Sequence, residues 1–146
     1  ILALGYRFEF DGAVICTCYD HEPYRNLFIT DPEDPDYDEA MAVEGEEVAR
    51  EQNKAIEDFF AGADLLIHDT QYTEKEYETK IGWGHSYFEH AIGSAKRAGV
   101  KRLALFHHDP DRNDQQIDEL GKQYCEPGSH GDLEVFFARD GMELDI

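Results

Sequence analysis

The chain has 146 residues with 13 Lys and Arg against 33 Asp and Glu, so its net charge is −20. This length is that of one ordinary domain, and a hydrophobic share of 41% is sufficient for a globular core. Because nucleic acids and anionic membranes bind basic surfaces, this charge argues against both, and the lack of a long apolar run or a charged leader predicts a cytoplasmic protein.

Two β-rich runs near the start of the chain predict an antiparallel hairpin. Residues 6–10 alternate apolar and polar side chains, residues 13–19 are again β-rich, and Asp11-Gly12 between them is a two-residue turn signal. Cys16 and Cys18 would share one face of the second strand. Two small buried side chains are the simpler interpretation, although a Cys-x-Cys pair is also able to ligate a metal.

An acidic loop follows the hairpin. Residues 31–39 hold six acids and two prolines without any base, which is typical of a solvated loop. The apolar spacing from Glu44 to Phe60 predicts a helix that ends near Gly62. Asp64 to His68 is a short, nearly continuous apolar run, which is typical of a strand covered on both faces.

The remaining elements alternate helix and strand. Ser86 and Glu89 have the spacing of a capping box and predict a helix as far as Ala98. A buried strand is expected over residues 102–106, a helix over 113–124 and a last strand over 133–138. The order ββ, αβ, αβ, αβ predicts one layered α/β unit.

Polar side chains follow several of these strands. Asp20 comes after the second strand of the hairpin, His68-Asp69 closes the next strand, and His107-His108 follows the one after it. His85 lies in a Gly-rich turn that leads into a helix. Groups at the ends of strands in α/β sheets converge on one edge, and imidazole with carboxylate suits Zn²⁺, Mn²⁺ or Fe. The residues alone leave two alternatives open, a metal-dependent hydrolase and a set of structural histidines.

Five segments decide between these alternatives because together, and in this order, they resemble the second half of a metallo-β-lactamase-fold hydrolase. The branch that they resemble contains ribonuclease Z and the small phosphodiesterases, and the segments are residues 4–12, 19–23, 64–72, 82–86 and 105–112. The resemblance implies an α/β fold, half of an αββα sandwich with a mixed sheet and covering helices. Residues 1–146 would then be the C-terminal portion of that domain.

The resemblance also implies metal ligands. In this family two divalent metal ions are held by a His-x-His-x-Asp-His motif, a further His, a bridging Asp and a last His. The bridging carboxylate maps to Asp20 and the last imidazole maps to His107, with His108 as the alternative in register. Zinc is the expected metal, with manganese and iron as alternatives.

A carboxylate and histidine pair completes the implied site. His85 would be the general acid that protonates the leaving group, and Asp69 would orient it, because a neighbouring carboxylate fixes the tautomer of an imidazole. His68 would support this pair from behind. Ser86 is expected to cap a helix rather than to act as a nucleophile.

One departure from the family is large. The chain contains no His-x-His-x-Asp-His motif, and a catalytic zinc normally takes three protein ligands. The chain also begins at Ile1 without an initiator Met. We therefore expect an N-terminal half upstream of Ile1. That half, or a second copy of the chain, would cover an apolar face of the sheet.

The predicted function is that of a metal-dependent hydrolase, most specifically a phosphodiesterase, that is complete only with the missing half. The acidic charge favours a small phosphodiester or ester as substrate, with no docking of nucleic acid and no membrane contact. Two alternatives of the same fold remain, a non-catalytic sensory or interaction module and a di-iron redox protein.

Overall fold

The computed structural model describes residues 3–146, so Ile1 and Leu2, where the sequence begins, lie outside the described residues. Strands β1 (Gly5–Phe10) and β2 (Ala13–Cys18) form the predicted hairpin. Its turn residues Asp11 and Gly12 both have positive φ, at 51° and 84°. Positive φ at both central residues is the conformation of a type I′ hairpin turn, which Asp-Gly favours, so the turn signal is confirmed.

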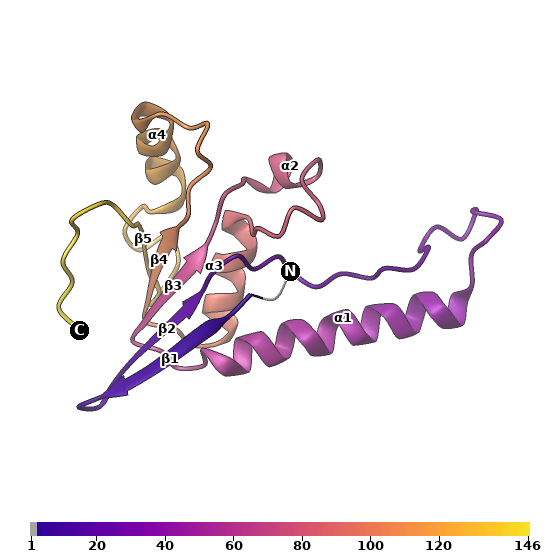
Figure 1. Ribbon diagram of the computed structural model, residues 1–146, viewed down its shortest axis with the longest axis horizontal. Helices are drawn as coiled ribbons and strands as arrows, with labels where there is room; N and C mark the ends of the chain where they lie inside the picture. Colours follow the sequence, from indigo (N-terminus) through magenta and orange to yellow (C-terminus); the bar gives the residue numbers. More distant parts are fainter. Residues whose placement is uncertain (1–2) are drawn as a thin grey trace.

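Beyond the hairpin the chain alternates helices and strands (Figure 1). The elements in chain order are α1 (Glu39–Phe59), β3 (Leu65–Asp69), α2 (Glu74–Tyr77), α3 (Phe88–Arg97), β4 (Arg102–Phe106), α4 (Asp114–Tyr124) and β5 (Glu134–Phe137).

The strands form one sheet in the order β1-β2-β3-β4-β5. The first pair is antiparallel, and the pairs from β2 to β5 are parallel. The arrowheads of β2, β3 and β4 accordingly point to the same edge of the sheet (Figure 1). This mixed sheet with covering helices confirms the predicted fold class, half of an αββα sandwich.

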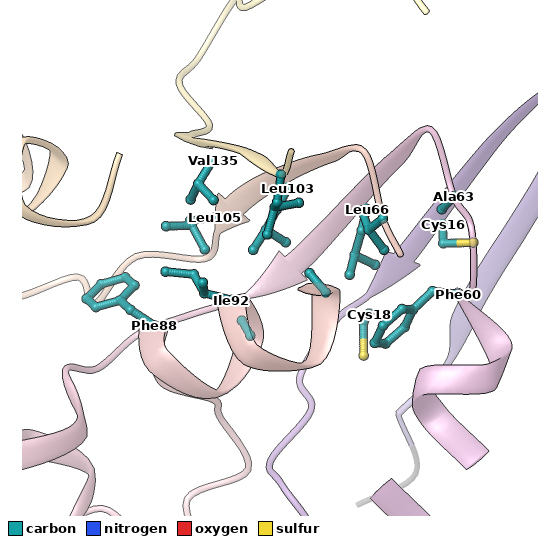
Figure 2. Packing of buried hydrophobic residues seen from close by; sticks show 14 of the residues in the cluster. Cys16, Cys18, Phe60, Ala63, Leu66, Phe88, Ile92, Leu103, Leu105 and Val135 are labelled. Carbon is teal, nitrogen blue, oxygen red and sulfur yellow. The ribbon is translucent and has the colours of Figure 1, made fainter. Parts of the chain in front are cut away.

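The core lies between one face of the sheet and the helices that cover it. Figure 2 shows strand residues such as Leu66 and Leu105 facing Phe88 and Ile92 of α3, with Phe60 closing the end near the hairpin. Cys16 and Cys18 lie in this core as free, buried thiols. The interpretation of both as small buried residues is therefore confirmed.

The opposite face of the hairpin is apolar and exposed. Arg7 reaches the carbonyl of Phe59 at the end of α1 with its guanidinium, so it points to the helix side. Because side chains alternate along a strand, Tyr6, Phe8 and Phe10 point to the other side, and all three are exposed. The sheet thus carries apolar surface without a covering helix, as a half sandwich would.

Two helix starts differ from the prediction. Helix α1 begins at Glu39 rather than at Glu44, because the Asp38 carboxylate accepts a hydrogen bond from the Met41 N–H at 3.0 Å and caps the helix. The predicted capping by Ser86 is wrong. The cap position of α3 is Tyr87, which makes no side-chain capping bond, and Ser86 is fully buried.

Helix α2 has no counterpart in the sequence prediction. It is a single turn held by a capping box of Thr73 and Glu76. A turn of four residues is too short to produce an apolar period. Among residues 3–146, no helix combines the length and the apolar composition that crossing a bilayer requires.

Candidate functional site

Four side chains meet at the edge of the sheet where β2, β3 and β4 end. Asp20, Asp69, His85 and His107 each offer a ligand atom, and these atoms all lie within 4.8 Å of one another. Asp20 follows β2, Asp69 closes β3, His107 follows β4, and His85 comes from the loop before α3. Because the ends of neighbouring parallel strands meet at one edge of the sheet, Asp20, Asp69 and His107 converge there. The loop before α3 adds His85 to the same cluster.

Asp69 is the buried centre of this cluster. Its Oδ2 atom accepts hydrogen bonds from the Nδ1–H of His85 at 2.7 Å and the Nδ1–H of His107 at 3.2 Å. Its Oδ1 atom accepts from the backbone N–H of Ser86 at 3.3 Å. Burial raises the pKa of Asp69 above its usual value, and the contacts with His85 and His107 oppose that rise. Both imidazoles thereby have Nδ1 turned toward Asp69, which leaves Nε2 of each ring for other partners.

Asp20 and His107 form the open side of the cluster. The Nδ1 atom of His107 lies 3.1 Å from Oδ1 of Asp20, and the two side chains are 40% and 57% exposed. Their φ angles are 59° for His107 and 48° for Asp20, and apart from turn residue Asp11 no other described non-glycine residue has positive φ. Backbone strain of this kind gathers at functional sites, where the surrounding structure holds it in place.

His68 lies behind the cluster rather than in it. It is fully buried, and its Nδ1–H donates to the backbone carbonyl of Asp69 at 2.7 Å. Burial lowers the pKa of His68 to about 3, so the ring stays neutral. The structure therefore places His68 behind the site, bonded to the backbone of Asp69 and packed edge-on against His21 of the cleft, and its catalytic role stays a prediction.

His108, the alternative to His107 as the metal ligand after β4, lies outside the cluster. The Nε2–H of His108 donates to the carbonyl of Ala138 at 3.2 Å, and the ring of His108 packs on Phe137. His107, in contrast, meets Asp20 and Asp69. The geometry thus brings His107 to the candidate metal site, and ligation itself stays a prediction.

The cluster opens into a cleft of about 900 Å³. Asp20, His85 and His107 lie in the lining of this cleft, beside apolar and aromatic residues that include Phe59 and Trp83. A concave site that combines apolar walls with a few convergent polar groups is the usual form of a ligand-binding pocket.

Glu22 is a residue of this site that the sequence prediction did not include. Its Oε1 atom accepts hydrogen bonds from the hydroxyl of Tyr77 at 2.8 Å and the N–H of Gly82 at 2.7 Å. Its Oε2 atom accepts from the N–H of Gly84 at 2.9 Å. Burial disfavours the carboxylate, but these hydrogen bonds outweigh it and hold the pKa of Glu22 below its usual value. Glu22 thus ties the segment of Asp20 to the segment of His85.

Curated relatives match parts of this chain. Ribonuclease Z of Brevibacillus brevis is 38% identical over 68 residues, which are 47% of this chain and 21% of that protein. Ribonuclease Z of Thermoplasma acidophilum is 35% identical over 99 residues, 66% of this chain and 32% of the relative. Ribonuclease Z of Thermoplasma volcanium is 37% identical over 79 residues, which are 52% of this chain and 26% of that protein. No family model matches the chain.

These matches correct one prediction. Each relative is named a ribonuclease, an enzyme that cleaves RNA, so the expectation of a small phosphodiester or ester substrate without nucleic acid docking is wrong. The physical reason is that net charge sums over the whole surface. In 0.1 M salt a bound molecule responds mainly to charges within about 10 Å.

The matched stretches span between 15% and 32% of the length of the relatives. The relatives bear the name of the branch that the five segments resemble, and the observed fold agrees with that resemblance. The resemblance is therefore confirmed: this chain is ribonuclease Z-like, with the architecture of one half of a metallo-β-lactamase-fold sandwich.

Proposed function

We propose that this chain forms the carboxyl-terminal half of a metal-dependent hydrolase that cleaves phosphodiester bonds in RNA. The observation that carries the proposal is the cluster of Asp20, Asp69, His85 and His107 at the edge of the sheet. The ribonuclease Z relatives supply the substrate class.

The donor set of the cluster fits a divalent cation. In this proposal Asp20 and His107 are the protein ligands, because they are the two most exposed members of the cluster and both have a strained backbone with positive φ. Carboxylate oxygen with imidazole nitrogen suits zinc, our first choice, and also manganese or iron. A bound cation supplies neutralisation of developing charge and activation of water.

Two cations need more ligands than Asp20 and His107 provide. A further segment with a His-x-His-x-Asp-His motif would supply the remainder, and residues 1–146 would then be the C-terminal portion of the complete domain. The exposed apolar face formed by Tyr6, Phe8 and Phe10 is where such a half would pack. A second copy of this chain could cover the same face but would not bring the motif.

In this proposal His85 is the general acid. His85 would act as the imidazolium, in which the Nδ1–H stays bonded to Asp69 at 2.7 Å and the Nε2–H passes its proton to the departing oxygen of RNA, leaving a neutral ring. Asp69 orients the ring of His85 and also contacts His107, so one carboxylate holds both the general acid and a proposed metal ligand. His68 keeps the end of β3 in place through its bond to the Asp69 carbonyl.

The test uses the protein expressed from the complete reading frame that contains this sequence, with metal content and RNA cleavage measured on the same preparations. About two zinc ions per protein and cleavage of RNA are expected. His85→Ala should slow cleavage by about 10²- to 10⁴-fold at unchanged metal content. Asp20→Ala should lower both.

Two outcomes contradict the proposal. A protein without metal that binds partners but cleaves nothing would be a non-catalytic module, and one that holds iron and transfers electrons would be a redox protein. Unchanged cleavage by His85→Ala would remove the general-acid assignment alone.

A further inference from the structure

Trp83 is a large aromatic side chain at the mouth of the candidate site. It is the only tryptophan of the chain, it is 60% exposed, and it lines the same cleft as His85 and Asp20. The proposed function assigns Trp83 no role, neither as a metal ligand nor as the general acid. An indole exposed in a cleft offers a large aromatic face on which a planar ring is able to stack.

The loop that carries Trp83 is held in one conformation. Gly82 and Gly84 flank the indole with φ angles of 88° and 89°, which side chains other than hydrogen rarely allow. The N–H groups of both glycines donate to the two carboxylate oxygens of Glu22. Tyr77, which also donates to Glu22, stacks on Tyr87 with ring centroids 4.6 Å apart. A ring presented in this way loses little entropy when a ligand stacks on it.

One face of the indole is already occupied by a cation. The ammonium of Lys80 lies 3.9 Å from the ring centroid of Trp83, over its face. A ligand would therefore use the other face. The same ammonium places a positive charge beside that ligand, which favours one that carries phosphate.

The charge of the cleft lining makes stacking the suitable form of recognition. The described residues that line the cleft include Asp20 and Glu22 but no Lys or Arg, so the RNA backbone gains little attraction from them. Stacking of a base on an aromatic ring does not depend on net charge, and every base offers a π-face. Single-stranded RNA is commonly bound in this way, with unstacked bases on aromatic side chains.

We propose that Trp83 is a stacking platform for a nucleobase of single-stranded RNA, next to the phosphodiester that reaches His85 and the metal ligands. This inference rests on the proposed function for its choice of RNA. Glu22 is the positioning residue that holds the platform, through the N–H groups of Gly82 and Gly84.

The test uses the tryptophan itself as the probe. Fluorescence of the protein from the complete reading frame is titrated with a short oligoadenylate and with an abasic ribose-phosphate strand of the same length, and subtraction of the Trp83→Leu signal isolates the emission of Trp83. The oligoadenylate should quench the emission and bind at least about tenfold more tightly than the abasic strand. Equal quenching by both strands would overturn the proposal. Adenosine monophosphate that binds as tightly as the oligoadenylate would overturn the assignment to an RNA chain.

Variants give a second, independent measurement, the anisotropy of labelled RNA. In Trp83→Leu the preference for oligoadenylate over the abasic strand should disappear, and in Trp83→Phe part of it should remain. Glu22→Gln should weaken oligoadenylate binding more than abasic binding. Lys122→Gln, on α4, is the matched surface control and should change neither. A preference that persists in Trp83→Leu would contradict the role of the indole.

The two proposals fail separately. Loss of base preference with intact RNA cleavage by the complete protein would overturn the stacking platform and leave the hydrolase. Base preference without any cleavage would leave the platform and overturn the hydrolase.

Discussion

Two regions of this molecule use carboxylates in opposite ways. The acidic arm, residues 31–58, holds 12 acids and 2 bases, so it carries −10 of the net charge of −20. It comprises the acidic loop and nearly all of α1, whose amino-terminal part extends well away from the sheet (Figure 1). At the edge of the sheet, by contrast, single carboxylates such as Asp69 and Glu22 each organise several donors.

The difference shows why total charge misleads about a site. Helix α1 has 21 residues and is therefore about 30 Å long, so the acids at its amino-terminal end lie several screening lengths from its other end. The acidic arm accounts for half of the net charge of the chain, whereas the candidate site is formed by a few residues at the sheet edge. Matched substitutions in the two regions separate these contributions.

The largest effect is expected from the buried carboxylate. Asp69→Asn removes the acceptor that orients both His85 and His107, and RNA cleavage by the complete protein should fall by about 10³-fold or more. Asp36→Asn makes the same chemical change on the arm and should leave cleavage unchanged. The measurement is the RNA cleavage rate of each variant. Equal losses of cleavage would show that the two regions do not differ in their contribution to the reaction.

Metal affinity should divide the two regions next. Asp20→Ala and His107→Ala each remove a proposed ligand and should weaken zinc binding by about 10- to 100-fold or more. In the unsubstituted protein, zinc at about 100 times its dissociation constant should stabilise the fold by about 2.7 kcal/mol, and this gain should shrink in both variants. Thermal unfolding with and without zinc provides the measurement. Asp34→Ala on the arm is the control, and a similar loss there would show non-specific binding to acids.

A smaller, pH-dependent effect is expected at Glu22. Because its pKa is lowered in the folded state, the stability that it contributes is present above the unfolded value and is lost as pH falls through the folded value. Glu22→Gln should therefore lower the free energy of unfolding by about 1 kcal/mol at pH 7, with a smaller difference from the unsubstituted chain below pH 4 or so. Denaturant unfolding at several pH values tests this. Glu33→Gln in the acidic loop should show no such trend.

The smallest effect is expected from neutralising the arm itself. The double variant Glu44→Gln and Glu46→Gln removes two charges far from the cleft, and RNA affinity at 0.15 M salt should change by less than about threefold. Anisotropy titrations with labelled RNA give this value. A larger gain in affinity would mean that the arm reaches the substrate.

Local signals in the sequence predicted most of the fold. The Asp11-Gly12 turn and the apolar run from Arg102 to Phe106 each act within a few residues, and each element lies where these signals place it. The helix predicted over residues 113–124 is also present, with Asn113 as its cap. The start of α1 was harder to place, because Asp38 reads as one more acid of the loop until its bond to the Met41 N–H is seen.

Long-range competition explains the failures at the site. Ser86 has the spacing of a helix cap, but its backbone N–H is bound by Asp69, 17 residues away, and its side chain is buried. Glu22 meets Gly82 and Gly84 about 60 residues along the chain, which no local pattern encodes. The convergence of Asp20, Asp69 and His107 was predictable because strand order alone brings strand ends to one edge.

The left-handed backbone of His107 has a consequence for how this protein would respond to selection. A non-glycine residue at φ 59° raises the energy of the folded chain by about 1 kcal/mol or more, which glycine would not. At position 107 the residue that would serve the reaction is therefore not the one that gives the most stable fold. Screening for heat resistance alone would tend to replace this imidazole, whereas screening for turnover would retain it. Variants recovered under the two pressures should differ first at this residue.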